Sequence, residues 1–184
     1  MRLTDWGLET KYAAAAPAPV LTGGRVIDGY ASLFGVPDQG GDVVRPGAYA
    51  AGLARLAAGA GRVRMLWQHD PAAPIGVWDE IAEDERGLRV KGRLLTEVAQ
   101  AREAAALIEA GAIEGLSIGY RTIRAERDDK GHRALSEVEL WEVSLVTFPM
   151  LPEARLAATK AAGEPEAAAL AGVFARAAAA LRIA

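Results

Sequence analysis

Residues 135–148 (LSEVELWEVSLVTF) constrain the fold of this chain more than any other segment. The run is rich in β-branched and other large apolar residues, which favour strands. Pro149 and Pro152 follow it, and proline cannot continue the hydrogen-bond ladder of a sheet. The segment therefore predicts a long strand that ends near residue 148.

Several shorter segments upstream have the same character and are separated by turn-forming residues. Leu88, Val90, Gly92 and Leu94 alternate with charged residues, which is the two-residue period of a half-buried strand. Residues 84–87 (DERG) are typical of a turn, so the segments on either side of them are expected to pair as a hairpin. The strands expected upstream span residues 25–34, 63–68, 76–81, 88–95 and 116–125.

One helix is clearly indicated and a second, shorter one is expected. Residues 97–110 are rich in alanine, glutamate and leucine, and Gly111 follows where a C-terminal cap belongs. Residues 48–58 form the shorter candidate. The whole pattern predicts a mainly β domain with flanking helices, which is an α+β arrangement.

Composition divides the chain into three zones. Residues 1–22 end in an alanine- and proline-rich stretch and are expected to form a flexible lead-in, whereas residues 23–158 carry the strand and turn pattern of the folded domain. Residues 159–184 form an alanine-rich tail, set off by Gly163, Glu164 and Pro165. A narrow apolar stripe in this tail favours a helix that docks on a partner or on its own domain, with a solvated or disordered end as an equal alternative.

Composition also excludes several classes of function. The 184 residues include no cysteine, which excludes a disulfide scaffold, thiol catalysis and cysteine-based zinc sites. With only two histidines, a histidine-rich metal site is not expected, and no cofactor is indicated. The net charge of −3 and the lack of a basic block argue against a nucleic-acid partner. No segment has the character of a signal peptide or a membrane span, so we expect a cytosolic protein without a membrane partner.

The chemistry is concentrated in a serine and a histidine. Ser117 lies in residues 115–119 (GLSIG), and His69 lies upstream in residues 67–70 (WQHD). A serine hydroxyl is a weak nucleophile until a base takes its proton, and histidine suits that role near neutral pH. Residues 115–119 also match the nucleophile elbow of α/β-hydrolases, but the elbow needs a helix after the serine and a histidine later still. Here the helix precedes the serine, so the order histidine, serine, acid is favoured.

The third group of such a triad is less certain from the residues alone. A third group that fixes the imidazole tautomer is needed, and Glu142 is the first choice, with Glu139 second and His132 as a further alternative. Residues three apart on a strand point to opposite faces, so only one of the two glutamates faces the site unless a bulge intervenes. Asp70 adjoins His69 but is expected to point away from it.

Each of these residues also has a purely structural interpretation. A serine between glycines in a strand is commonly a packing residue, and a histidine after a buried strand is commonly a hydrogen-bonded structural group. A glutamate in an apolar strand is commonly exposed at an edge or paired with a cation. Asp38 and Asp42 are expected to form a turn rather than a cation site.

Over residues 25–158 the sequence resembles the prohead proteases of HK97-like tailed phages and related gene transfer agents. The resemblance depends on several motifs that occur in the same order and are together specific. They are residues 29–34 (GYASLF), 42–49 (DVVRPGAY), 66–70 (LWQHD) with 75–76 (IG), 87–90 (GLRV), 115–120 (GLSIGY) and 142–149 (EVSLVTFP).

The resemblance implies a serine endopeptidase related to the herpesvirus assembly proteases, with a β-barrel core flanked by helices. Those enzymes use a His–Ser–His arrangement, and in this chain Glu142 takes the third position beside His69 and Ser117. It implies a protease that is packaged in the procapsid in the host cytoplasm and cleaves the scaffolding portion of the major capsid protein. Its own chain is a further candidate substrate, and homo-oligomerisation is left open.

Two other functions are compatible with the sequence. One is a catalytically silent scaffold or capsid-binding protein of the same fold, in which replacing His69 or Ser117 would leave assembly unchanged. The other is a small esterase, although the chain shows no segment with the character of an apolar lid or acyl pocket.

Overall fold

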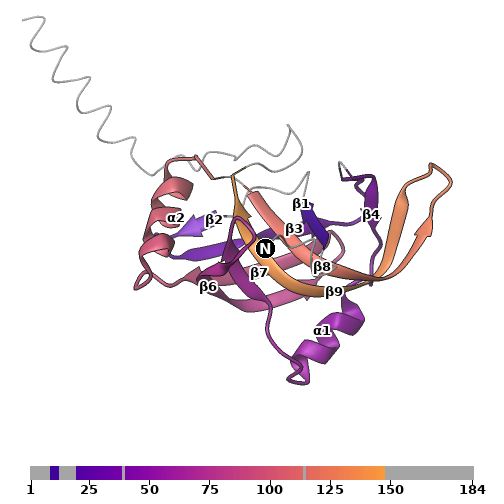
Figure 1. Cartoon of the computed structure of the whole chain (residues 1–184), viewed down its shortest axis with the longest axis horizontal. Coiled ribbons are helices and arrows are strands. Elements are labelled where there is room, and N and C mark those ends of the chain that lie inside the picture. Colours follow the sequence, from indigo (N-terminus) through magenta and orange to yellow (C-terminus); the bar gives the residue numbers. More distant parts are fainter. Residues whose placement is uncertain (1–8, 13–19, 39, 114, 148–184) are drawn as a thin grey trace, which may run out of the picture.

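In the part of the chain that the structure describes, nine strands form a single curled sheet and two helices pack against it. The computed structural model describes residues 9–12, 20–38, 40–113 and 115–147. The strands are β1 (Glu9–Tyr12), β2 (Val20–Thr22), β3 (Val26–Leu33), β4 (Asp42–Val44), β5 (Arg64–Trp67), β6 (Asp70–Glu83), β7 (Gly87–Leu94), β8 (Gly115–Arg127) and β9 (Arg133–Val146). The sheet order is β1-β8-β9-β5-β6-β7-β3-β2, and β4 pairs separately with β9 (Figure 1).

The sheet is mixed, and β9 is an interior strand that pairs with three others, β8, β5 and β4. β9 pairs antiparallel with β8 along almost its whole length and parallel with β5 on its other side. The sheet curls strongly enough that β3 also packs against β8, although the two are not neighbours in it. The fold is therefore mainly β with flanking helices, as the sequence predicts, and the curled sheet forms a half-barrel. Its apolar core includes residues of both the sheet and the helices.

The two helices flank the sheet at different places (Figure 1). They are α1 (Ala50–Ala57), which packs against β9, and α2 (Ala99–Glu109), which packs against β6. α2 ends in the cap that the sequence predicts. Gly111 has φ of 70°, its N–H donates to the carbonyl of Ile108 at 3.0 Å, and the N–H of Ala112 donates to the carbonyl of Leu107 at 2.8 Å. These two bonds satisfy carbonyls that the end of the helix leaves without a partner.

The expected strands and helices are found, with differences at their ends. The hairpin of β6 and β7 is confirmed, but β6 begins at Asp70, well before the expected start. The sequence did not indicate β1, β2 or β4, and the described part of the expected lead-in, residues 1–22, consists of β1 and β2. The tail at residues 159–184 lies outside the described residues.

β1 lies along the outer side of β8. Its backbone is antiparallel to β8, with Tyr12 opposite Ser117 and Thr10 opposite Gly119. Because β1 is the last strand of the sheet on this side, it covers the edge of β8 next to the serine.

Asp38 and Asp42 lie in the turn that the sequence predicts, and Asp42 has an anchoring role that the sequence did not indicate. The Asp38 carboxylate accepts a hydrogen bond from the N–H of Asp42 at 2.8 Å. The nearly buried Asp42 carboxylate accepts from Arg133 at 2.8 and 2.6 Å and from the Tyr120 hydroxyl at 3.1 Å. The aspartate therefore ties β4 to the beginning of β9 and to the middle of β8.

Replacing Asp42 by alanine is expected to destabilise the fold by about 3 kcal/mol, because a partly buried guanidinium and a buried hydroxyl lose a shared partner. Denaturant-induced unfolding measures this loss. Asp79→Ala is the matched control, since the Asp79–Arg93 pair is exposed and its removal is expected to cost less than about 1 kcal/mol. Equal losses in the two variants would contradict the anchoring role of Asp42.

Candidate active site

The pairing of β8 with β9 places the candidate nucleophile and the candidate acid on the same face of the sheet. Ser117 is the register partner of Ser144, and Gly119 is the register partner of Glu142. Directly opposed residues, and residues two apart on one strand, point to the same face. Both Ser117 and Glu142 are buried, at 0% and 3% exposure. The residues between them, Ile118 and Val143, belong to the apolar core on the opposite face.

His69 occupies a tight turn between β5 and β6. Trp67 pairs with Asp70 across this turn, and the two residues between them have positive φ angles, 52° for Gln68 and 61° for His69. Positive φ at both central positions is the arrangement of a type I′ hairpin turn, which glycine and asparagine normally adopt. Each of these two residues therefore stores strain of about 1–2 kcal/mol.

Contacts with the end of β9 hold this strained turn in place. The N–H of Gln68 donates to the carbonyl of Leu145 at 3.0 Å, and its side-chain amide donates to the hydroxyl of Thr147 at 2.5 Å. Asp70 turns away from the histidine, as expected, and accepts from the N–H of Ala72 at 2.8 Å. The sequence predicted continuous strand up to Gln68 and gave no signal for this turn, because neither central residue is glycine or asparagine.

His69 and Glu142 form a buried pair. The Nδ1 atom of His69 lies 2.6 Å from the Oε1 atom of Glu142. Because a carboxylate only accepts hydrogen bonds, Nδ1 carries the proton in this contact, and Nε2 is then the basic nitrogen of the neutral ring. The other carboxylate oxygen, Oε2, accepts a hydrogen bond from the Ser144 hydroxyl. Glu142 is therefore held through both oxygens, by residues from two different parts of the chain.

Gly119 makes room for the Glu142 side chain. A Cβ atom at this position would lie 2.3 Å from Oε1 and 2.8 Å from Cδ of Glu142, far inside van der Waals contact. The second glycine of residues 115–119 therefore has a specific packing role. It lets the carboxylate cross over β8 and reach the histidine.

The two alternative third residues lie in other contacts. Glu139 accepts a hydrogen bond from Arg121 at 2.5 Å and is about one-third exposed. His132 lies in the turn between β8 and β9, with its Nδ1 atom 3.0 Å from Asp128. The structure thus brings His69 together with Glu142, and with neither Glu139 nor His132.

A bulge in β9 explains why strand alternation does not distinguish the two glutamates. The register passes from Gly119 opposite Glu142 to Tyr120 opposite Leu140, which leaves Trp141 as an extra residue. Such an extra residue changes which face the following side chains occupy. This is the bulge that the sequence analysis allowed for. Glu139 and Glu142 are therefore distinguished by their exposure and their ion pairs, and not by alternation alone.

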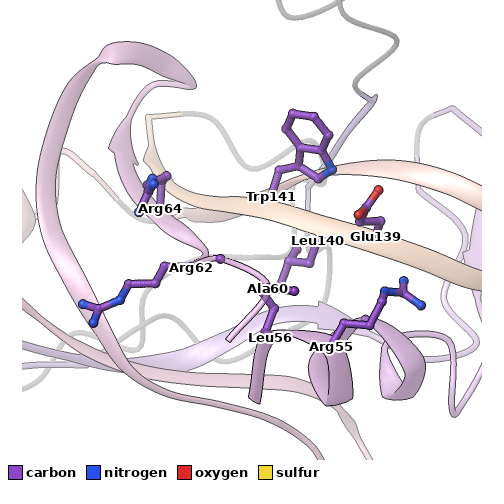
Figure 2. Close-up of a pocket in the computed structure, with 10 residues that line it drawn as sticks. Arg55, Leu56, Ala60, Arg62, Arg64, Glu139, Leu140 and Trp141 are labelled. Atoms are coloured by element: carbon purple, nitrogen blue, oxygen red, sulfur yellow. The ribbon is translucent and has the colours of Figure 1, made fainter. Parts of the chain in front are cut away.

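A separate hollow lies between α1 and β9. It has a volume of about 350 Å³, and its lining includes Arg55, Arg62, Arg64 and Trp141 but none of Ser117, His69 or Glu142 (Figure 2). Figure 2 shows Arg55 and Arg62 extending in opposite directions, while Leu140 points toward the helix. Because these cations do not converge on one point, we assign no ligand to the hollow.

The described part of the chain contains no cluster of three or more histidine, cysteine, aspartate and glutamate side chains suited to a metal ion. Within the same residues, no helix is long and apolar enough to cross a membrane.

Comparison with known proteins identifies the family. Residues 14–167 match the family described as Caudovirus prohead serine protease. The chain belongs to this family. It is 36% identical over 143 residues to the prohead protease of Enterobacteria phage HK97, a match that covers 73% of this chain and 60% of that protein. It is also 34% identical over 155 residues to the capsid polyprotein of Pseudomonas phage PAJU2, covering 79% of this chain and 22% of that protein.

A solved structure supports the fold of this family member. The bacteriophage T4 capsid assembly protease gp21 superposes with a TM-score of 0.59 over 77% of this chain and 98% of that one, at 15% sequence identity. At this identity the likeness establishes the shared fold alone. The chain spans less than two thirds of the length of both sequence relatives described above.

Gly119→Ala is expected to displace the Glu142 carboxylate and break its hydrogen bond to His69. Nitrogen-15 spectra of the imidazoles measure this effect, because the chain has only two histidines. In the unsubstituted chain His69 is expected to show a protonated, slowly exchanging Nδ1, and Gly119→Ala is expected to lose that signal. Ile123→Ala, at an exposed position of the same strand, is the control. An unchanged His69 signal in Gly119→Ala would contradict this account of the glycine.

Proposed function

We propose that this chain is a prohead maturation serine endopeptidase. Its substrate is the scaffolding portion of the major capsid protein, with its own chain as a second substrate. The observation that carries the proposal is the buried contact of 2.6 Å between His69 and Glu142, on the sheet face that also holds Ser117. Membership of the prohead protease family supports the same chemistry.

In this mechanism His69 Nε2 takes the proton of the Ser117 hydroxyl as the oxygen attacks the scissile carbonyl. The resulting imidazolium gives that proton to the leaving amine, and the C–N bond breaks to leave an acyl-enzyme ester on Ser117. Water then attacks the ester, with His69 again taking and returning the proton. Glu142 holds the ring in the required tautomer and stabilises the imidazolium, so it remains ionised throughout.

The proposed substrate is supported by the names of two relatives. One is a prohead protease, and in the other a segment similar to this chain is part of a capsid polyprotein. We accordingly place the reaction inside the assembling procapsid, within the host cytoplasm. There the substrate is present at high local concentration.

Co-expression with the capsid protein encoded beside this chain tests the proposal. Intact masses are expected to show a shortened capsid protein with the unsubstituted chain and full-length capsid protein with Ser117→Ala. Ser136→Ala, a replacement of an exposed serine on β9, is the control and is expected to cleave normally. Identical capsid-protein masses for the unsubstituted chain and Ser117→Ala would contradict proteolysis and favour the silent scaffold.

A second experiment tests the assignment of the acid. Glu142→Gln is expected to reduce the cleavage rate by roughly 10³- to 10⁴-fold, because the amide no longer enforces the tautomer or stabilises the imidazolium. Glu139→Gln breaks only a partly exposed ion pair and is expected to change the rate by less than about threefold. Cleavage time courses with purified capsid protein give both rates, and a larger loss in Glu139→Gln would reverse the assignment.

A further inference from the structure

Ser144 is the residue of this site that the catalytic scheme leaves without a role. Its side chain is completely buried, at 0% exposure, and it is the direct cross-strand partner of Ser117. Its hydroxyl donates a hydrogen bond to Oε2 of Glu142, while His69 occupies Oε1. Removing a hydroxyl that donates to a buried carboxylate is destabilising, because the carboxylate is shielded from water and depends on the protein donors around it.

The two contacts together define the plane of the carboxylate. A carboxylate held through one oxygen can rotate about its last side-chain bond, whereas one held through both oxygens has a single orientation. Ser144 and Glu142 are two apart on β9, so the backbone of one strand fixes the donor relative to the acceptor. His69, in contrast, reaches the carboxylate from the turn after β5.

The surroundings of Glu142 offer few other charges. β8 presents Ser117 and Gly119, which are uncharged, and the β5–β6 turn presents His69. Arg64 on β5 is the register partner of Glu142, but its side chain is exposed and lines the separate hollow beside α1. A neutral donor placed directly on Oε2 therefore acts on the pair at closer range than any cation described here.

We propose that Ser144 is a positioning residue that orients the Glu142 carboxylate and stabilises its ionised form, and thereby sets the orientation and basicity of His69. This inference rests on the proposed function. A hydroxyl that donates to a carboxylate stabilises the form without the extra proton. Because His69 shares a hydrogen bond with the same carboxylate, loss of the Ser144 donor affects both partners of that contact. Removal of the Ser144 hydroxyl takes away its stabilisation of the ionised carboxylate.

Two consequences follow for the Ser144→Ala variant. The rate at which Ser117 reacts falls by roughly 10- to 100-fold, the range that corresponds to the loss of a hydrogen bond to a charged group. The acid limb of the pH–rate profile moves to higher pH, because the variant no longer has the hydroxyl that stabilises the ionised carboxylate. Ser144→Thr keeps the hydroxyl and is expected to restore most of the rate and the original profile.

Labelling with a fluorophosphonate measures these effects without knowledge of the cleavage sequence. The probe forms a bond from phosphorus to the attacking serine oxygen and releases fluoride, and peptide mapping locates the adduct. The rate would be measured from pH 5 to pH 9 on the full chain and on Ser144→Ala, Ser144→Thr and Ser136→Ala. The expected adduct is on Ser117 in every variant, slowed and shifted only in Ser144→Ala.

Three outcomes would overturn the inference. One is labelling of Ser144 itself, which would make it the nucleophile. The second is an unchanged rate and profile in Ser144→Ala. The third is a slower rate with an unchanged profile, together with a failure of Ser144→Thr to restore it, which would show a merely structural role.

A second measurement separates this inference from the proposed function. Failure of the unsubstituted chain to react with the probe or to cleave capsid protein would contradict the proposed function. The imidazole nitrogen-15 spectra still decide the role of Ser144, because they need no activity. Faster exchange of the His69 Nδ1 proton in Ser144→Ala, restored in Ser144→Thr, supports positioning, and an unchanged signal overturns it.

Discussion

The site depends above all on the backbone register between β8 and β9. In this register Ser117 lies opposite Ser144, and Gly119 lies opposite Glu142. All four residues therefore belong to the same face of the sheet. A slip of β9 by one residue would move Glu142 and Ser144 to the opposite face, so that they would no longer share a face with Ser117. The buried apolar residues that alternate with them therefore hold the chemistry in place, because they stabilise this register and no other.

The polar cluster adds local costs that the rest of the fold offsets. A buried glutamate, a histidine and a glutamine with left-handed backbone, and a strand glycine each disfavour the folded state when considered alone. Each of these unfavourable features contributes to the geometry of the site. The glycine admits the carboxylate, the left-handed turn aims the imidazole, and the carboxylate fixes its tautomer. Such conflicts between local preference and global structure are expected to gather at functional sites.

The sequence indicated the strands and helices in which apolar residues repeat at a regular spacing or the composition is typical of a helix. β7, β8, β9 and α2 are long enough for alternation or helical composition to show, and the cap at Gly111 has its own residue signature. β1, β2 and β4 are three or four residues long and exist because a partner strand lies beside them, so no local pattern marks them. Glu142 and Glu139 were both candidates because both are carboxylates in an apolar strand. The sequence could not separate them by face, because the bulge at Trp141 is visible only in the pairing with β8. The sequence did not indicate a role for Ser144, because that role depends on Glu142 two residues away and on Ser117 across the sheet.

The position of β9 has a consequence for how the site comes into being during synthesis. β9 is the last strand of the described chain in sequence, yet it lies between β8 and β5 in the sheet. While the ribosome is still making this strand, the turn with His69 and the strand with Ser117 have no shared neighbour and the imidazole has no acid. In the proposed mechanism, Ser117 and His69 therefore lack their shared acid until β9 has paired with both β8 and β5. A nascent or truncated chain that stops before residue 142 would lack that acid altogether.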